Sequence, residues 1–448
     1  MFGIVIYVLV IIASLVRYFQ KRYVSFIVLL SFLVGDGYFV ISSGGVKPMD
    51  FYNIVVLTIT AYHTLRGDHF FGSSHDKIGR WIRILLIYGF CCTILTIIRG
   101  QETPIYAFLV YRFDLFLLAY FIFRRIPIER IHRAMLIIIK ISVFTGILYV
   151  LQNFGISLLN NGVEEYSGDG VVRLSNFPFM VTAILFYLIV WGGGVKHRMW
   201  LILLFAVIIA LIQSRGLMLS VGVSVVIFLI RLRGKKVRNL VITIIAAMIC
   251  LPIVEYRFNK NRVTGGGVLT EMKLSYEMIA SGTYSKYYGS NVIYNQGTFV
   301  HRILYVAERI SYLSQKPFSL VFGEGLVHES SQNIKRYRFI MGVYIPETRT
   351  IHQQIDTTDV SLISHVFRYG LIYLFIYAYI IYLMIRGSYR SDNKFLQVLF
   401  FVILIKLFQM LGADVFYNFP HMFYVLMISP LIFNNQKSDR CINSNSKL

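Results

Sequence analysis

The sequence predicts an all-α fold: a polytopic membrane protein with about 12–13 transmembrane helices and one large outer loop. Of its 448 residues, 56% are hydrophobic and only 15% are charged, far below the charged share of a soluble protein. The apolar residues also occur in blocks of roughly 17–25, the length at which a helix crosses a hydrocarbon core. Both observations exclude an ordinary water-soluble domain.

The predicted membrane-spanning segments follow the apolar runs along the chain. They lie near 2–16, 23–42, 51–65, 81–98, 106–123, 134–154, 176–192, 199–213, 216–230, 238–254, 359–385, 395–412 and 419–433. No small-residue cleavage site follows the first run, so it is expected to be a retained helix and not a signal peptide. The four cysteines lack the spacing of a disulfide framework or a metal site, and neither is expected.

Basic residues concentrate in alternate short connections, after the first, third, fifth, seventh, ninth and eleventh spans. They are Arg17, Lys21, Arg22, Arg66, Lys77, Arg80, Arg124, Arg125, Arg130, Arg133, Lys196, Arg198, Arg231, Arg233, Lys235, Lys236, Arg238, Arg386, Arg390 and Lys394. Membrane proteins load short cytoplasmic loops with Lys and Arg, so these connections are predicted to be cytoplasmic. The net charge of +22 is thereby explained as a topology signal, and no nucleic-acid partner is expected.

This alternation divides the chain into four parts. Residues 1–254 hold ten transmembrane helices, and 255–358 form the large periplasmic loop. Residues 359–433 hold the C-terminal transmembrane helices, and 434–448 are a cytoplasmic tail. Loops of this length without a role are uncommon, so the loop is the candidate functional domain.

One helix is expected inside the loop, near 299–313. Apolar residues recur there at steps of 4, 3, 4 and 3, which is one helical face: Phe299, Ile303, Val306, Ile310 and Leu313. Other faces carry polar residues: His301, Arg302, Glu308 and Arg309. Such a helix either lies on the membrane surface or packs on its own loop domain, and the pattern leaves both open.

Two outer boundaries hold the residues best suited to chemistry. The tight connection Gln213-Ser-Arg-Gly216 leaves Arg215 at the membrane surface, where its planar guanidinium either binds phosphate oxygens or reaches lipid headgroups. Asp359 precedes an apolar run, where it is either a helix cap or a general base. His352 and His365 are candidates for the same proton transfer. No nucleotide-binding loop or metal-hydrolase motif occurs, so no cofactor or metal is expected.

Three motifs across roughly 170–385 resemble the O-antigen polymerase and ligase superfamily of bacterial surface-polysaccharide assembly. The first is Gln213-Ser-Arg-Gly-Leu-Met-Leu-Ser220, which is similar to that family's Ser-Arg-Gly motif. The second runs from Arg302 through the amphipathic helix to Lys316-Pro-Phe-Ser-Leu-Val-Phe-Gly-Glu-Gly325. The third is Asp359 to Gly370 with its following apolar run.

The resemblance implies a metal-independent glycosyltransferase of the bacterial inner membrane whose donor is a glycan on undecaprenyl pyrophosphate. An acceptor sugar hydroxyl attacks the anomeric carbon and the lipid pyrophosphate leaves. Carried onto this sequence, Arg215 and Arg302 bind and stabilise the pyrophosphate, Arg173 joins them, and Asp359 is the catalytic acidic residue. Membrane lipid and a chain-length regulator are the further partners that the family implies.

Polymerase and ligase differ in this superfamily at the start of the third motif. Ligases carry a His-Asn pair there, and this chain has Thr358-Asp359. The sequence therefore favours a polymerase of repeat units over a ligase that transfers finished glycan to a lipid or protein acceptor. A lipid-linked oligosaccharide flippase is the alternative from another class, and the lack of a repeat between the two halves of the chain speaks against it.

Overall fold

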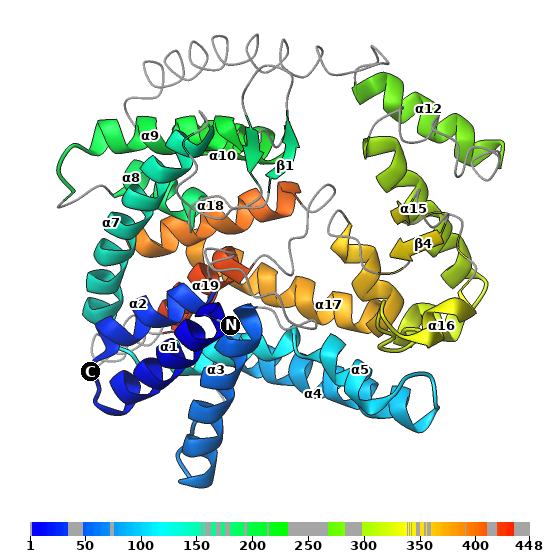
Figure 1. Cartoon of the computed structure of the whole chain (residues 1–448), viewed down its shortest axis with the longest axis horizontal. Coiled ribbons are helices and arrows are strands. Elements are labelled where there is room, and N and C mark those ends of the chain that lie inside the picture. The colour runs from blue at the N-terminus through cyan, green and yellow to red at the C-terminus, as the bar shows by residue number, and fades with distance from the viewer. Residues whose placement is uncertain are drawn as a thin grey trace, which may run out of the picture.

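The computed structural model is built almost wholly of helices, with two short β-hairpins (Figure 1). It describes residues 2–34, 48–71, 76–153, 156, 163–166, 172–174, 180–191, 195–212, 215–231, 268–282, 298–337, 339, 341, 343–345, 350–353, 355, 360–389, 391–409 and 419–433. The predicted span at 238–254 and the tail at 434–448 lie outside these residues.

Helices occupy the other predicted segments. The N-terminal half contains α1 (Phe2–Phe19), α2 (Tyr23–Val34), α3 (Pro48–Leu65), α4 (Lys77–Ile98), α5 (Pro104–Tyr111), η1 (Asp114–Leu118), α6 (Ala119–Phe123), α7 (Ile128–Asn153), α8 (Val181–Val190), α9 (Arg198–Leu211) and α10 (Arg215–Arg231). The C-terminal part contains α17 (Ser361–Tyr389), α18 (Lys394–Gln409) and α19 (Phe419–Ile428).

The predicted outer loop holds α12 (Val268–Ala280), α15 (Thr298–Ser314), α16 (Pro317–Phe322) and η2 (Gln332–Arg336). Two antiparallel hairpins complete the described elements. One joins β1 (Val163–Tyr166) to β2 (Val172–Leu174), and the other joins β3 (Val343–Ile345) to β4 (Thr350–Gln353).

Three described helices are long and apolar enough to cross a membrane: Lys77–Ile98, Ile128–Asn153 and Leu362–Tyr389. A fourth candidate is the bent pair Pro104–Tyr111 and Asp114–Phe123, and six shorter apolar helices accompany them. This composition is compatible with a membrane protein. The count of 12–13 spans stays a prediction.

The outward faces of these helices are apolar, which is the reverse of a soluble surface. On α1, five residues at steps of 4, 3, 4 and 3 are each between 44% and 60% exposed: Val5, Leu9, Ile12, Val16 and Phe19. A similar exposed stripe runs along α7: Ile137, Ile141, Phe144 and Ile147. Such stripes are unfavourable in water and are suited to contact with lipid chains.

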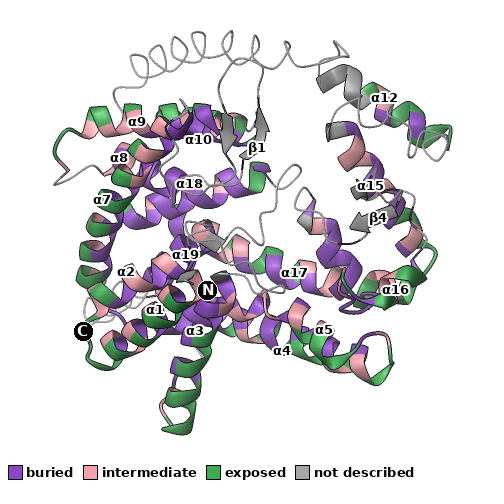
Figure 2. Ribbon diagram, in the orientation of Figure 1, coloured by how far each residue is buried: buried purple, intermediate pink, exposed green. Residues whose placement is uncertain are grey.

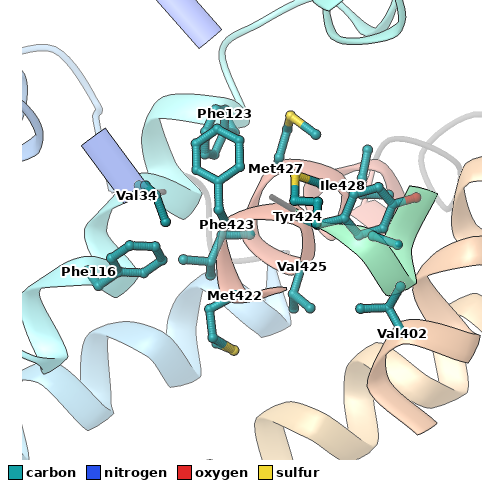
Figure 3. Packing of buried hydrophobic residues seen from close by; sticks show 14 of the residues in the cluster. Val34, Phe116, Phe123, Val402, Met422, Phe423, Tyr424, Val425, Met427 and Ile428 are labelled. Carbon is teal, nitrogen blue, oxygen red and sulfur yellow. The ribbon is translucent and has the colours of Figure 1, made fainter. Parts of the chain in front are cut away.

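The centre of the bundle is formed around α19, which is buried along most of its length (Figure 2). Phe423 contacts the rings of Tyr52 and Phe123, at centroid distances of 6.4 and 5.4 Å. The close-up shows Phe116, Val34 and other apolar side chains grouped around the same helix (Figure 3). A helix that is apolar on all sides belongs in such a position.

The connections in which basic residues concentrate meet in the structure. The Tyr18 hydroxyl is 2.8 Å from His63 Nε2, which joins the C-terminal ends of α1 and α3. Arg124 Nη1 lies 2.8 Å from Asp76 Oδ2, which joins the end of α6 to the start of α4. Arg125 Nη1 lies 3.1 Å from His63 Nδ1. The first, third and fifth predicted spans therefore end in one place.

The remaining basic connections meet in a second group. The His132 ring at the start of α7 stacks on Trp191, which follows α8, with centroids 4.5 Å apart. Trp191 also contacts Phe395 at the start of α18, at 4.7 Å. The Arg231 guanidinium at the end of α10 lies 4.9 Å from the Tyr389 ring at the end of α17. This grouping agrees with the alternation that the charges predict.

The predicted span at 106–123 is not one continuous helix. It bends by 46° between α5 and η1, at Arg112 and Phe113. Breaking a helix frees a backbone carbonyl, and here the Asn53 side chain donates to the Arg112 carbonyl at 2.8 Å. The Arg112 side chain itself pairs with Asp50 at 3.0 Å. These contacts from α3 stabilise a bend that the run of apolar residues does not reveal.

Candidate functional site

Of the four predicted site residues, only Arg302 has a described side chain. It lies on α15 and is half-buried. Arg215 is the first residue of α10, and Arg173 lies in β2 opposite Glu165. The side chains of both, and all of Asp359, lie outside the described residues. Their convergence on one site therefore stays a prediction.

The helix α15 packs on its own loop and on α17, which is one of the two alternatives that the pattern left open. Its buried apolar residues include Val300, Leu304 and Leu313, in a cluster with residues of α17 such as Phe367. The expected apolar face is partly wrong, because Ile310 is 49% exposed. The buried face is rotated toward the positions occupied by Tyr305, Glu308 and Arg309.

Arg309 explains this rotation. Its guanidinium carbon lies 3.9 Å from the ring centroids of both Tyr305 and Phe339, and the side chain is 1% exposed. It pairs with Glu308 and donates to the Met341 carbonyl, while the Met341 amide donates to Glu308 at 2.9 Å. Burial lowers the pKa of Arg309 from its usual value. Aromatic faces and a buried carboxylate can hold a guanidinium in a position that hydrophobic periodicity assigns to solvent.

Arg302 shares the helix face of Tyr305 and Arg309, because residues three and seven apart lie on the same side of a helix. The Tyr305 hydroxyl donates to the Ile355 carbonyl at 2.8 Å, and the Ser364 hydroxyl donates to the same carbonyl. Ile355 and Ser364 flank Asp359 in the sequence. The face that carries Arg302 is thus fixed against the segment on either side of Asp359.

The second and third motifs cross backbone to backbone. The Glu324 amide donates to the Phe367 carbonyl at 2.8 Å, and the Gly325 amide donates to the Arg368 carbonyl at 3.2 Å. A Cβ on Gly323 would lie 2.1 Å from the Arg368 carbonyl oxygen. A Cβ on Gly370 would lie 2.2 Å from the Val321 carbonyl oxygen.

Both crossing glycines also have backbone angles that other residues rarely adopt. Gly323 has φ +85° and Gly370 has φ +79°, and the latter interrupts the helical geometry inside α17. Glycine is therefore required at each position for two reasons: the backbone φ angle is positive, and a backbone oxygen leaves no room for a Cβ. The predicted span at 359–385 is correspondingly a broken helix and not a straight one.

The Arg368 side chain also contributes to this crossing. Its side chain is fully buried, and Nη2 and Nε donate to the Val327 carbonyl at 2.9 and 3.2 Å. Glu324, whose amide donates to the carbonyl of the residue before Arg368, is also buried, and its carboxylate pairs with Lys316 at 3.3 Å. Burying the Arg368 charge this deeply costs several kcal/mol unless it is well paired. Its bonds to the Val327 carbonyl hold the segment after α16 against α17.

Glu102 is a buried carboxylate that no sequence pattern singles out. It follows α4, and its carboxylate accepts from the His328 amide at 3.2 Å, the Ser331 hydroxyl at 2.8 Å and the Asn333 amide group at 3.1 Å. Its partners lie more than two hundred residues away in the sequence. No local pattern could have revealed the contact, which anchors the outer loop to the α4–α5 connection.

Glu102→Ala is expected to lower the unfolding free energy by about 2–4 kcal/mol, because several donors lose a charged acceptor. The measurement is the thermal midpoint of the detergent-purified protein by fluorescence-detected gel filtration. Glu277→Ala on α12 is the matched control, since that side chain is 57% exposed and pairs only at 3.9 Å with Lys273. Equal midpoints for the two variants would contradict the anchoring role.

No group of three or more His, Cys, Asp or Glu side chains suited to a metal ion occurs among the described residues. No family model matches the chain, and no curated protein matches it.

Proposed function

We propose that the protein polymerises surface polysaccharide by joining undecaprenyl-pyrophosphate-linked oligosaccharide repeat units at the outer face of the inner membrane. The acceptor hydroxyl forms a new bond to the anomeric carbon of the donor glycan. The bond from that carbon to the pyrophosphate oxygen breaks, and the hydroxyl proton passes to Asp359. The departing pyrophosphate carries the developing negative charge, and Arg215 and Arg302 stabilise it, with Arg173 beside them.

The observation that carries the proposal is the crossing of Gly323 and Gly370. It joins the second and third motifs of the resemblance, which are far apart in sequence, at two glycines where no other residue fits. The helix with Arg302 packs on the same part of α17. Motifs that belong to one site are expected to meet in this way.

The apolar outward stripes of α1 and α7 further support a membrane location, which a lipid-linked donor requires. No nucleotide or metal is needed, because the pyrophosphate ester of the donor supplies the free energy of the transfer. The substrate itself is thus the activated species.

The test is gel analysis of surface glycan and of lipid-linked intermediates from cells that lack the gene. Loss of the long ladder, with single repeat units still reaching the surface, is the expected result. Long lipid-linked polymer that accumulates without transfer to its final acceptor would indicate a ligase instead. An unchanged ladder with unchanged intermediates would contradict both activities.

A further inference from the structure

The short helix α16 presents an apolar face that is largely exposed among the described residues. Phe318, Val321 and Phe322 are spaced i, i+3 and i+4, and they are 58%, 38% and 45% exposed. The Phe318 and Phe322 rings contact one another, with centroids 4.7 Å apart. The Gly323 crossing fixes α16 against α17, so this face has a defined direction and is not a loosely placed loop.

The end of α4, which lies beside this face, and the α5 that follows it are also apolar and exposed. Ile98 at the end of α4 and Ile105 at the start of α5 are each 74% exposed, and Phe108 is 43% exposed. The Arg99 guanidinium carbon lies 5.5 Å from the Phe318 ring centroid, which places α16 beside the end of α4. Exposed positions are visible along both α16 and α5 in Figure 2. Because α4 is a candidate span, the apolar face of α16 extends its lipid-facing surface.

Cations border the apolar face on the side of the loop. Arg99 stacks on Phe318, and Arg336 is exposed and donates to the Gly100 carbonyl at 3.3 Å. Lys316 immediately precedes α16 and is half-exposed, with Glu324 3.3 Å away. Aromatic residues together with Arg and Lys are the composition that proteins use at the boundary between headgroups and acyl chains.

We propose that α16 is an interfacial anchor in the outer leaflet of the membrane. Phe318, Val321 and Phe322 insert among the upper acyl carbons, and Arg99 and Arg336 contact the phosphates of phospholipid headgroups. The anchor fixes the height of the outer loop above the bilayer. It requires that the protein is embedded in a membrane, but it does not depend on the polymerase activity.

The test is the depth of spin labels in the full-length protein, reconstituted into phosphatidylethanolamine–phosphatidylglycerol nanodiscs. The native cysteines are replaced, and single cysteines are introduced as F318C and F322C. Collision with oxygen, which concentrates in the bilayer, is compared with collision with a water-soluble nickel chelate. The lipid control is I98C on α4, and the aqueous control is K273C on α12, where the native side chain is 79% exposed.

The expected result is an oxygen-to-nickel ratio at 318 and 322 that is several-fold above that at 273 and close to that at 98. Labels at 318 and 322 that behave like the label at 273 would overturn the anchor. Labels shielded from both reagents would overturn it as well, because another protein surface would then cover the helix. Gel filtration of each labelled variant confirms that it is folded before the comparison is made.

Discussion

Gly323→Ala and Gly370→Ala are each expected to remove nearly all folded protein from the membrane. The added Cβ would lie 2.1 or 2.2 Å from a backbone oxygen, and backbone cannot move aside as a flexible side chain can. A positive φ with ψ near 180° is essentially a glycine-only conformation and adds about 1–3 kcal/mol for alanine, and overpacking adds roughly 1–3 kcal/mol or more. The measurement is the amount and monodispersity of a fluorescent-protein fusion after mild detergent extraction.

Substitutions at two other glycines distinguish the effect of the backbone angle from the effect of the steric clash. Gly100 has φ +62° with nothing within 4 Å of an added Cβ, so Gly100→Ala tests the backbone angle alone. Gly222 lies in α10 with open space around it and no positive φ, so Gly222→Ala is expected to be neutral. If Gly323→Ala is no worse than Gly100→Ala, the crossing is looser than the structure indicates.

Arg302→Ala is expected to lower the proposed polymerase activity by about 10²–10³-fold, the usual effect of removing one group that stabilises developing negative charge. The amount of folded protein should change little, since the side chain is only half-buried. The measurement is the rate of polymer formation from purified lipid-linked repeat units, normalised to the extracted protein.

Two further substitutions serve as comparisons for Arg302→Ala. Arg302→Lys keeps the charge but loses the planar donor fork, so it should recover only part of the activity. Lys273→Ala removes a cation that is 79% exposed on α12 of the same loop, and full activity is expected. Full activity in Arg302→Ala would remove Arg302 from the site while leaving the fold and the anchor untouched.

The helices could be predicted because each corresponds to a local run of apolar residues. The run at 134–154 is apolar over a membrane's thickness, and α7 occupies Ile128–Asn153. Alternating charge in the connections predicts one common side for them, and the contact between Tyr18 and His63 at the ends of α1 and α3 is compatible with that prediction. Such signals need only neighbouring residues, so a single sequence contains them.

The rest depends on contacts between distant segments. The residues near Arg112 in the sequence do not indicate a bend, because Asn53 and Asp50 of α3 stabilise the bend. Arg309 was assigned to a polar face, since periodicity cannot anticipate that Phe339 and Tyr305 enclose it. The role of Asp359 cannot be judged from its sequence position, which fits a helix cap as well as a base.

The crossing of Gly323 and Gly370 has a mechanical consequence. Two amide hydrogen bonds and close backbone contact leave the segment after α16 and the start of α17 without room to slide, and Glu102 clamps the same segment to the end of α4. These parts should therefore move as one rigid body. Any opening that admits the proposed lipid-linked donor is therefore expected from another part of the loop, and slow amide exchange at Glu324 and Gly325 would mark the stationary part.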